Sequence, residues 1–153
     1  IFQNLKLQPK RTIRFVAFAN EENGSRGGKE LLAYAKKGNE KIIAGIESDE
    51  GGLTPRGFSF DTDEVNLAKI QTWKGLFEPY LIHSFTKGHS GADIEPLTSA
   101  KIIKAGLHPD SQRYFDYHHA ANDNFDGVNK RELELGAATM AALMYLIDQN
   151  GLQ

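Results

Sequence analysis

The chain has 153 residues, of which 40% are hydrophobic and 25% are charged, and its formal net charge is −2. This length fits one domain with a sizeable core, and the composition excludes an intrinsically disordered chain. The near-neutral charge argues against nucleic acid or a membrane as partner, and the absence of cysteine leaves only His, Asp and Glu to hold a metal.

The start of the chain suggests that further residues precede it. The first seven residues read as the last turns of a helix that has no start signal, so we expect further residues upstream of Ile1. Residues 12–19 mix β-branched and aromatic side chains in a short run, which predicts a buried strand. Ser25 then stands where it would cap a helix that runs to about Lys37.

Residues 41–48 form a second predicted strand, nearly continuous in apolar residues, as in a parallel sheet covered on both faces. With the preceding strand and helix it makes a βαβ unit with a right-handed crossover. The next predicted elements are a loop over 51–60, a helix from the capping pair Asp61 and Glu64 to about Phe77, a strand over 81–85, a loop over 86–96, a short helix over 98–105 and a loop-rich segment over 111–126.

A final helix is predicted to begin at Asn129, with Glu132 three residues further on. Its core-facing stripe is expected at Leu133, Ala137, Met140, Met144 and Ile147. The alternation of strands and helices predicts a single α/β domain with a mostly parallel central sheet.

Acidic residues follow both of the first two predicted strands. Glu21 and Glu22 come directly after the first strand, and Asp49 comes after the second. In open α/β sheets ligands bind outside the carboxyl ends of the strands, so these acids stand where a site would form. The pair His118 and His119 adds imidazole, and carboxylates with imidazole are the ligand set of a hydrolytic zinc site.

Four ordered motifs resemble the M28 zinc peptidases, and within them the carboxypeptidase Q branch. They are residues 20–27 (NEENGSRG), 47–51 (ESDEG), 91–96 (GADIEP) and 117–123 (YHHAAND). The resemblance extends from residue 12 to the last helix. It implies a three-layer sandwich with helices on both faces of the sheet, and a single truncated zinc-peptidase catalytic domain over 1–153 that lacks its N-terminal strands.

Residue by residue, the resemblance assigns a general base and three metal ligands. It implies that Glu21 is the general base, that Glu22 binds one zinc ion and that Asp49 binds the other. His119 matches the final ligand, because the family places its histidine four residues before the aspartate that is Asp123 here. Two zinc ions are expected in the complete domain.

Several positions depart from the family pattern or stay outside the site. His118 is then a neighbour of the site, although a one-residue slip would exchange the two histidines. Ala120, directly after His119, replaces the Thr or Ser that family members often have at that position. Asp93 is expected to hold its loop. The remaining histidines are expected on the surface or in loops: His83, His89 and His108.

The family takes a further His and a metal-bridging Asp from a segment upstream of the Glu-Glu pair. The chain therefore holds three of five expected ligands, and alone it should bind zinc weakly and be inactive or nearly so. Missing strands would expose a sheet edge that could drive homo-oligomer formation.

The implied function is a zinc-dependent exopeptidase that acts on small peptides, secreted or periplasmic, with no nucleic acid or membrane partner. Aminopeptidase, carboxypeptidase and dipeptidase activity all stay open. Two alternatives remain: a glutaminyl-cyclase-like zinc acyltransferase, and a peptidase-like recognition module that has lost its metal.

Overall fold

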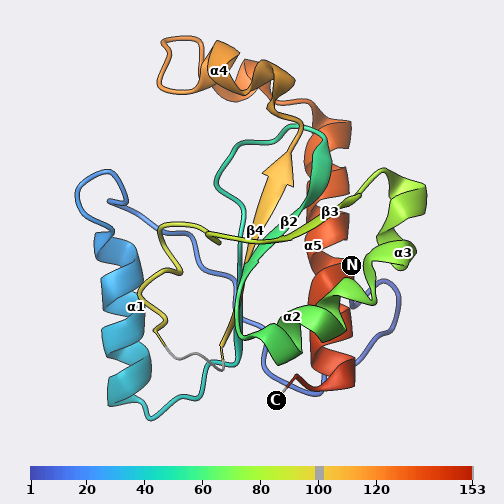
Figure 1. Cartoon of the computed structure of the whole chain (residues 1–153). Coiled ribbons are helices and arrows are strands. Elements are labelled where there is room, and N and C mark those ends of the chain that lie inside the picture. Colours follow the sequence, from blue (N-terminus) through green and yellow to red (C-terminus); the bar gives the residue numbers. More distant parts are fainter. Residues whose placement is uncertain (99–101, 153) are drawn as a thin grey trace.

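The computed structural model describes residues 1–98 and 102–152, and within them four strands form one sheet in the order β1-β4-β2-β3 (Figure 1). The strands are β1 (Ala44–Glu47), β2 (Pro55–Asp61), β3 (Ser84–Lys87) and β4 (Ile103–Pro109). The α-helices are α1 (Arg26–Lys37), α2 (Glu64–Gln71), α3 (Lys74–Phe77), α4 (Tyr114–Tyr117) and α5 (Lys130–Asn150), and the short 3-10 helices are η1 (Glu78–Tyr80), η2 (Ser111–Arg113) and η3 (Phe125–Gly127). Figure 1 shows α1 on one side of the sheet and α2, α3 and α5 on the other, which gives the predicted three layers.

The strand pairings confirm a mostly parallel sheet. β1 runs parallel to β4 and β2 runs parallel to β3, while β2 and β4 are antiparallel. Because β1 and β4 point the same way, their carboxyl ends lie at the same edge of the sheet, the upper edge in Figure 1. Ligands of open α/β sheets bind at such an edge, so this is where the predicted site should form.

The core is dominated by phenylalanine from the middle of the sheet. Phe58 and Phe60 of β2 are fully buried, and their ring centroids lie 5.9 and 5.4 Å from that of Phe85 on β3. Residues two apart on a strand face the same side, so these rings form one layer beneath the helices. The other buried members of this core are Leu67, Ile70, Trp73, Phe77, Ile82, Ile103, Ala105, Leu107, Leu143 and Ile147.

The long helix α5 begins as predicted, and its core-facing stripe differs in part from the predicted one. The Oδ1 atom of Asn129 accepts hydrogen bonds from the N–H groups of Arg131 and Glu132, which confirms the cap. The buried positions are Gly136, Thr139, Leu143, Ile147 and Asp148, whereas Leu133 and Ala137 are exposed. The predicted stripe was therefore wrong for Leu133 and Ala137, whereas Ile147 is buried and Met140 packs against the core as predicted.

The predicted strand over 12–19 is wrong, and with it the βαβ unit. These residues form no strand; Phe15 is 90% exposed and Val16 is 41% exposed. A strand needs a neighbour that accepts its backbone hydrogen bonds, and within the described residues this segment has none. The prediction of a loop over 51–60 is also wrong, because Pro55–Asp61 forms β2, one of the two inner strands of the sheet.

The middle of the chain also departs from the predicted boundaries. The helix expected over 61–77 is divided into α2 and α3, and Asp63, not Asp61, caps α2 by accepting from the N–H of Asn66. The strand expected over 81–85 is confirmed with a shift to β3. Of the helix expected over 98–105, residues 99–101 lie outside the described ranges, and the last three residues belong to β4.

The helix α1 has the predicted bounds but not the predicted cap. Ser25 occupies the N-cap position with φ 51°, and its side chain makes no capping hydrogen bond. Residues 2–6 form hydrogen-bonded turns instead of the end of a helix. Among the helices in 1–98 and 102–152, none has the length and apolar character needed to cross a membrane.

Candidate active site

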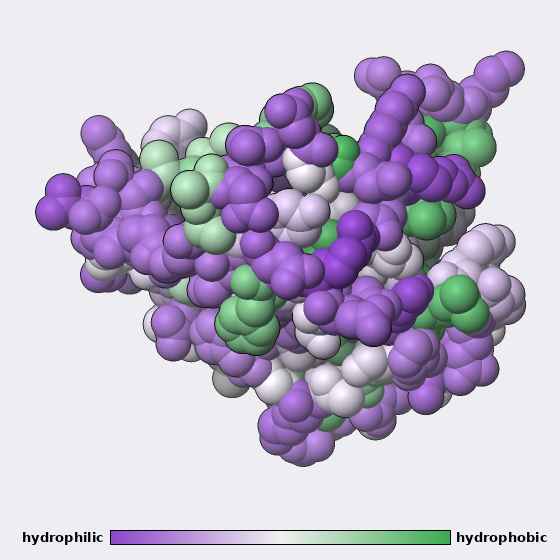
Figure 2. Space-filling model, turned by 90° about the horizontal axis from the view of Figure 1, so that it is seen from above, coloured by the Kyte–Doolittle hydropathy of each residue, from purple (hydrophilic) through white to green (hydrophobic). Residues whose placement is uncertain are grey.

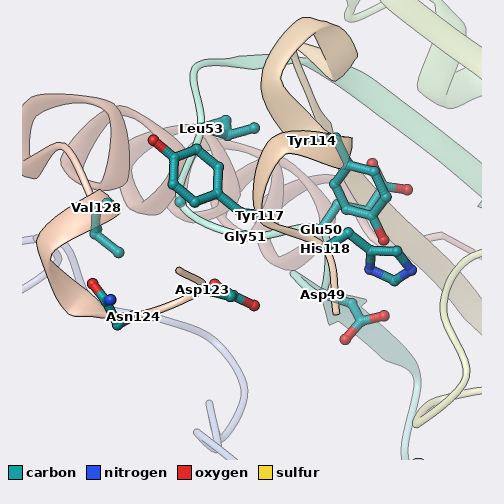
Figure 3. A pocket seen from close by; sticks show the side chains of 12 residues that line it. Asp49, Glu50, Gly51, Leu53, Tyr114, Tyr117, His118, Asp123, Asn124 and Val128 are labelled. Carbon is teal, nitrogen blue, oxygen red and sulfur yellow. The ribbon is translucent and has the colours of Figure 1, made fainter. Parts of the chain in front are cut away.

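A cavity of about 130 Å³ opens beside the carboxyl end of β1 (Figure 3). Asp49 and Glu50, directly after β1, form one part of its wall, and Tyr114, Tyr117 and His118 form another. The remaining lining comes from the loop after Glu50 and from the segment that leads into α5. Seen from above, this end of the molecule is mostly hydrophilic, with small separate hydrophobic areas (Figure 2). The surroundings of the cavity therefore suit a polar ligand.

The pair Glu21 and Glu22 lies in the turn that leads into α1. The backbone N–H groups of residues 25–27 donate to the carbonyl oxygens of residues 19–21. Asn20 has φ 60°, a left-handed conformation that Asn adopts more readily than most residues. The first N–H groups of α1 thus hold the turn that presents the two carboxylates.

The structure brings Glu22 into contact with His119, although the two residues are far apart in sequence. The Nε2 atom of His119 lies 3.0 Å from the Oε1 atom of Glu22, and the two side chains are 63% and 71% exposed. His119 also has φ 54°, a left-handed conformation that His, like Asn, adopts more readily than most residues. Two of the three predicted metal ligands therefore lie side by side.

Asp49 follows β1 as predicted, is exposed, and lines the cavity together with His118 (Figure 3). The imidazole of His118 stacks on Tyr114 with a centroid separation of 4.7 Å, and it lies 4.1 Å from the ring of His119. The two histidines thus face different acids: His119 contacts Glu22, and His118 shares the cavity with Asp49. The assignment of His119 over His118 as ligand stays a prediction.

The donors present fit part of a zinc site. Within residues 1–98 and 102–152, no three His, Asp or Glu side chains form a group that could hold a metal ion. Two atoms bound to one tetrahedral zinc at about 2.0–2.1 Å lie about 3.4 Å from each other. The 3.0 Å separation in the Glu22 and His119 pair is a direct ion-pair contact, shorter than that value, so the two atoms would have to move slightly apart to bind one ion. Asp49 would need donors from elsewhere.

Glu47, the last residue of β1, supports the site from below and was not predicted. Its buried carboxylate accepts hydrogen bonds from the N–H groups of Asp93 at 3.3 Å and Ile94 at 2.9 Å. Burial raises the pKa of the Glu47 carboxyl, and these two N–H groups oppose the rise. Gly91, at φ 127°, leaves no room for a β carbon beside this carboxylate. An acid that closes an apolar strand was the signal in the sequence.

Carboxylates gather around the cavity and act on one another. Burial raises the pKa of the Tyr114 phenol, and the charges of Glu50, Asp49 and Glu22 raise it further. Burial also raises the pKa of Asp93, with a further contribution from Asp49. The phenol therefore stays protonated as a hydrogen-bond donor, and the excess negative charge favours a bound cation. The sequence had left Tyr114 in a loop without a position.

The three remaining histidines were expected on the surface or in loops. His83 and His89 are exposed and lie outside the strands, as predicted. The prediction was wrong for His108, which lies on β4 with a half-buried ring. The His108 ring nitrogens lie 2.9 Å from the Oε1 atom of Glu50 and 2.6 Å from the Oγ atom of Ser59. The apolar run of β4 extends to this residue and carries it into the sheet.

Comparison with known proteins agrees with the sequence motifs. Residues 1–144 match the sequence model of Peptidase family M28. Carboxypeptidase Q from Rattus norvegicus, Homo sapiens and Xenopus laevis is 27%, 28% and 29% identical over 96% of this chain, which spans 31% of the length of each. The crystal structure of a peptidase M28 precursor from Shewanella amazonensis SB2B superposes with a TM-score of 0.84 at 28% identity, covering 95% of this chain and 33% of that one. The chain belongs to peptidase family M28.

Proposed function

We propose that this chain carries part of the active site of a zinc-dependent exopeptidase that hydrolyses small peptides. The 3.0 Å contact between Glu22 and His119 carries the proposal, because it joins two separate motifs into one pair of zinc donors. The position of Asp49 in the adjoining cavity supports it, as does the likeness to carboxypeptidase Q.

In this proposal each side chain has a distinct role. Glu22 and His119 would hold one zinc ion, and Asp49 would contribute to the site of a second. Zinc, when bound, lowers the pKa of a water molecule towards about 7 and so provides the nucleophile. Glu21 accepts the proton of that water and passes it to the leaving amine, so the peptide bond is cleaved without a covalent intermediate. Tyr114 offers its O–H to a peptide oxygen in the cavity.

The 153-residue chain alone should hold zinc weakly. It spans 31% of the length of its carboxypeptidase Q relatives, and the family resemblance assigns two further ligands to a segment that precedes Glu21. We therefore propose that this chain by itself cleaves little or no peptide. Association into a homo-oligomer and a secreted or periplasmic location belong to the same proposal.

The test measures zinc content and peptide hydrolysis in the protein as its gene encodes it. Glu21→Gln should keep the metal and lower kcat by about 10²–10⁴-fold, because the carboxylate that accepts the proton is lost. Glu22→Gln and His119→Ala should weaken zinc binding. The matched control is His83→Ala, since His83 is an exposed loop histidine away from these acids and should change neither quantity.

The outcomes separate the rival functions. A parent protein that binds no zinc and cleaves no peptide would contradict the proposal and favour a recognition module. Release of a cyclised N-terminal residue, in place of hydrolysis, would favour a glutaminyl-cyclase-like acyltransferase. Full activity in Glu21→Gln would remove the general base from the proposal.

A further inference from the structure

Three polar side chains form a continuous row beneath the cavity. The Nδ1 atom of His108 lies 2.9 Å from the Oε1 atom of Glu50, and its Nε2 atom lies 2.6 Å from the Oγ atom of Ser59. Glu50 belongs to the loop after β1, His108 to β4 and Ser59 to β2. The row therefore joins two strands of the sheet to the loop that carries Asp49.

The hydrogen-bond directions at Ser59 are fixed by its third contact. The hydroxyl of Ser59 donates its single proton to the carbonyl oxygen of His89, because a carbonyl can only accept. The Oγ atom must then accept from His108, so the Nε2 atom of His108 carries a proton. This polarity is the reverse of that in a nucleophilic serine, where the histidine nitrogen receives the hydroxyl proton. Ser59 is also 5% exposed, so the row is not a Ser-His-Glu hydrolase site.

The other end of the row fixes the second ring nitrogen. The carboxylate of Glu50 is an acceptor, so the Nδ1 atom of His108 also carries a proton. His108 is thus an imidazolium ion that donates in two directions. The hydrogen bond to Glu50 raises the pKa of His108, against the opposing effect of burial. Both partners are 38% exposed, so the pair is partly shielded from solvent.

The row of Glu50, His108 and Ser59 holds two segments near Asp49. At one end it fixes Glu50, the residue directly after Asp49. At the other end it fixes the carbonyl of His89, just before the loop that Glu47 holds through the N–H groups of Asp93 and Ile94. Asp49 itself is exposed, and within residues 1–98 and 102–152 its carboxylate has no hydrogen-bond partner, so its place depends on its neighbours.

We propose that His108 is a positioning residue for Asp49: its Nδ1–H holds Glu50, and Glu50 keeps the loop and the Asp49 carboxylate at the cavity. The proposal rests on the proposed function, because it makes His108 a support for a zinc ligand. It assigns the two ends of the imidazole different importance. The Nδ1 bond positions the loop, and the Nε2 bond to Ser59 only anchors the ring.

Two substitutions of similar size separate these ends. Asn in place of His108 can keep a donor near the Nδ1 position and so retain Glu50, whereas Gln can keep a donor near the Nε2 position and retain Ser59. Each variant loses one hydrogen bond and the charge, so a merely stabilising role predicts equal effects from both. Positioning through Glu50 predicts that only His108→Gln disturbs the loop.

The experiment has a readout that needs no metal and one that does. Amide hydrogen exchange of residues 48–53 in the metal-free protein, as its gene encodes it, should become faster in His108→Gln than in His108→Asn. Zinc affinity, from competition with a chromophoric chelator, should fall by about 10–100-fold in His108→Gln, as for other groups that support a metal ligand. His108→Asn should stay within a few-fold of the parent.

The outcomes separate this inference from the proposed function. Equal exchange rates and equal zinc affinities in the two variants would overturn the positioning role while leaving the zinc site intact. Faster exchange in His108→Gln alone, with no zinc bound by the parent, would support the positioning of Asp49 and overturn the zinc peptidase proposal. A larger effect of His108→Asn than of His108→Gln would show that Ser59, not Glu50, is the partner that matters, and would overturn the inference.

Discussion

Aromatic residues are buried at one end of the sheet and exposed at the other. At the β2 and β3 end, Phe58 and Phe60 are fully buried against Phe85 and the helices. At the β1 end, Phe15 is 90% exposed in a segment of the same apolar character. The difference shows that an apolar run becomes a strand only where another strand accepts its hydrogen bonds and a helix covers its side chains.

The candidate site takes residues from segments on both sides of the sheet. The turn before α1 and the loop after β1 supply Glu22 and Asp49, whereas His119 comes from the segment that leads into α5. Helix α5 contributes Leu143 and Ile147 to the main buried core of the described residues, whereas no residue of α1 belongs to that core. The geometry of the site therefore depends on how firmly the α1 side is held.

The largest expected effect contrasts the two phenylalanines. Phe58→Ala should lower the free energy of unfolding by about 3–5 kcal/mol, because it leaves a cavity among packed rings. Phe15→Ala in the same chain should change it by less than about 0.5 kcal/mol, since the ring is exposed. Urea unfolding of both variants measures the difference, and a similar loss for the two would mean that Phe15 is buried in solution.

A pair of glycines tests how closely the α1 side is packed at the site. A β carbon at Gly28 of α1 would overlap the carbonyl oxygen of Asp93, whereas one at Gly75 of α3 would meet no atom within 4 Å. Gly28→Ala should therefore cost about 1–3 kcal/mol, and Gly75→Ala should be neutral or stabilising by up to about 1 kcal/mol. Thermal unfolding compares them; a neutral Gly28→Ala would mean that the loop around Asp93 yields easily.

Much of the fold could be predicted, and the errors have physical causes. The helix α5 was found because its cap is a local signal, read within one turn of the chain, and the bounds of α1 were found although Ser25 makes no capping bond. The strand β2 was missed because Pro55 and Gly57 are typical turn residues, and only pairing with β4 and β3 makes this segment part of a sheet. The strand over 12–19 was wrongly predicted because its residue pattern is typical of a strand, whereas within the described residues no neighbouring strand accepts its hydrogen bonds.

The site could be predicted in outline only. The position of acids at strand ends and the family motifs predicted Glu22, Asp49 and His119; the structure places Glu22 against His119, and the role of the three as ligands stays a prediction. The supporting contacts of Glu47 and His108 could not be predicted, because they join residues that are distant in sequence through a carboxylate or a ring nitrogen. Sequence spacing carries no information on such contacts.

The two helix caps provide a smaller contrast between the same regions. Asn129 accepts two hydrogen bonds at the start of α5, whereas the Ser25 side chain makes no capping bond at the start of α1. Asn129→Ala should cost about 1 kcal/mol, and Ser25→Ala should cost much less. Urea unfolding followed by circular dichroism measures both; equal losses would show that Ser25 caps α1 in solution.

The smallest expected effect is a dependence of stability on pH, caused by Glu132 in the first turn of α5. Glu132 accepts from Thr54 Oγ1 at 2.5 Å and from Arg113 at 2.6 and 2.8 Å, and these contacts, led by Thr54, lower its pKa below the ordinary value of 4.5. A lowered carboxyl pKa means that the folded protein binds the proton less readily than the unfolded chain. The stabilisation is therefore present above about pH 4.5 and is lost as the pH falls through the folded-state pKa.

Glu132→Gln should remove this part of the acid dependence, and the matched control at the other end is Glu40→Gln. The carboxylate of Glu40 accepts a hydrogen bond from Arg14 at 2.9 Å, and this contact lowers the pKa of Glu40. A single surface ion pair contributes little, so Glu40→Gln should flatten the curve less than Glu132→Gln does. Unfolding free energies between pH 7 and pH 3 measure the two slopes. If Glu40→Gln had the larger effect, the ion pair at the β1 end would stabilise the fold more than the contacts of Glu132 do. The contrast between the two ends of the sheet would then be confined to their apolar packing.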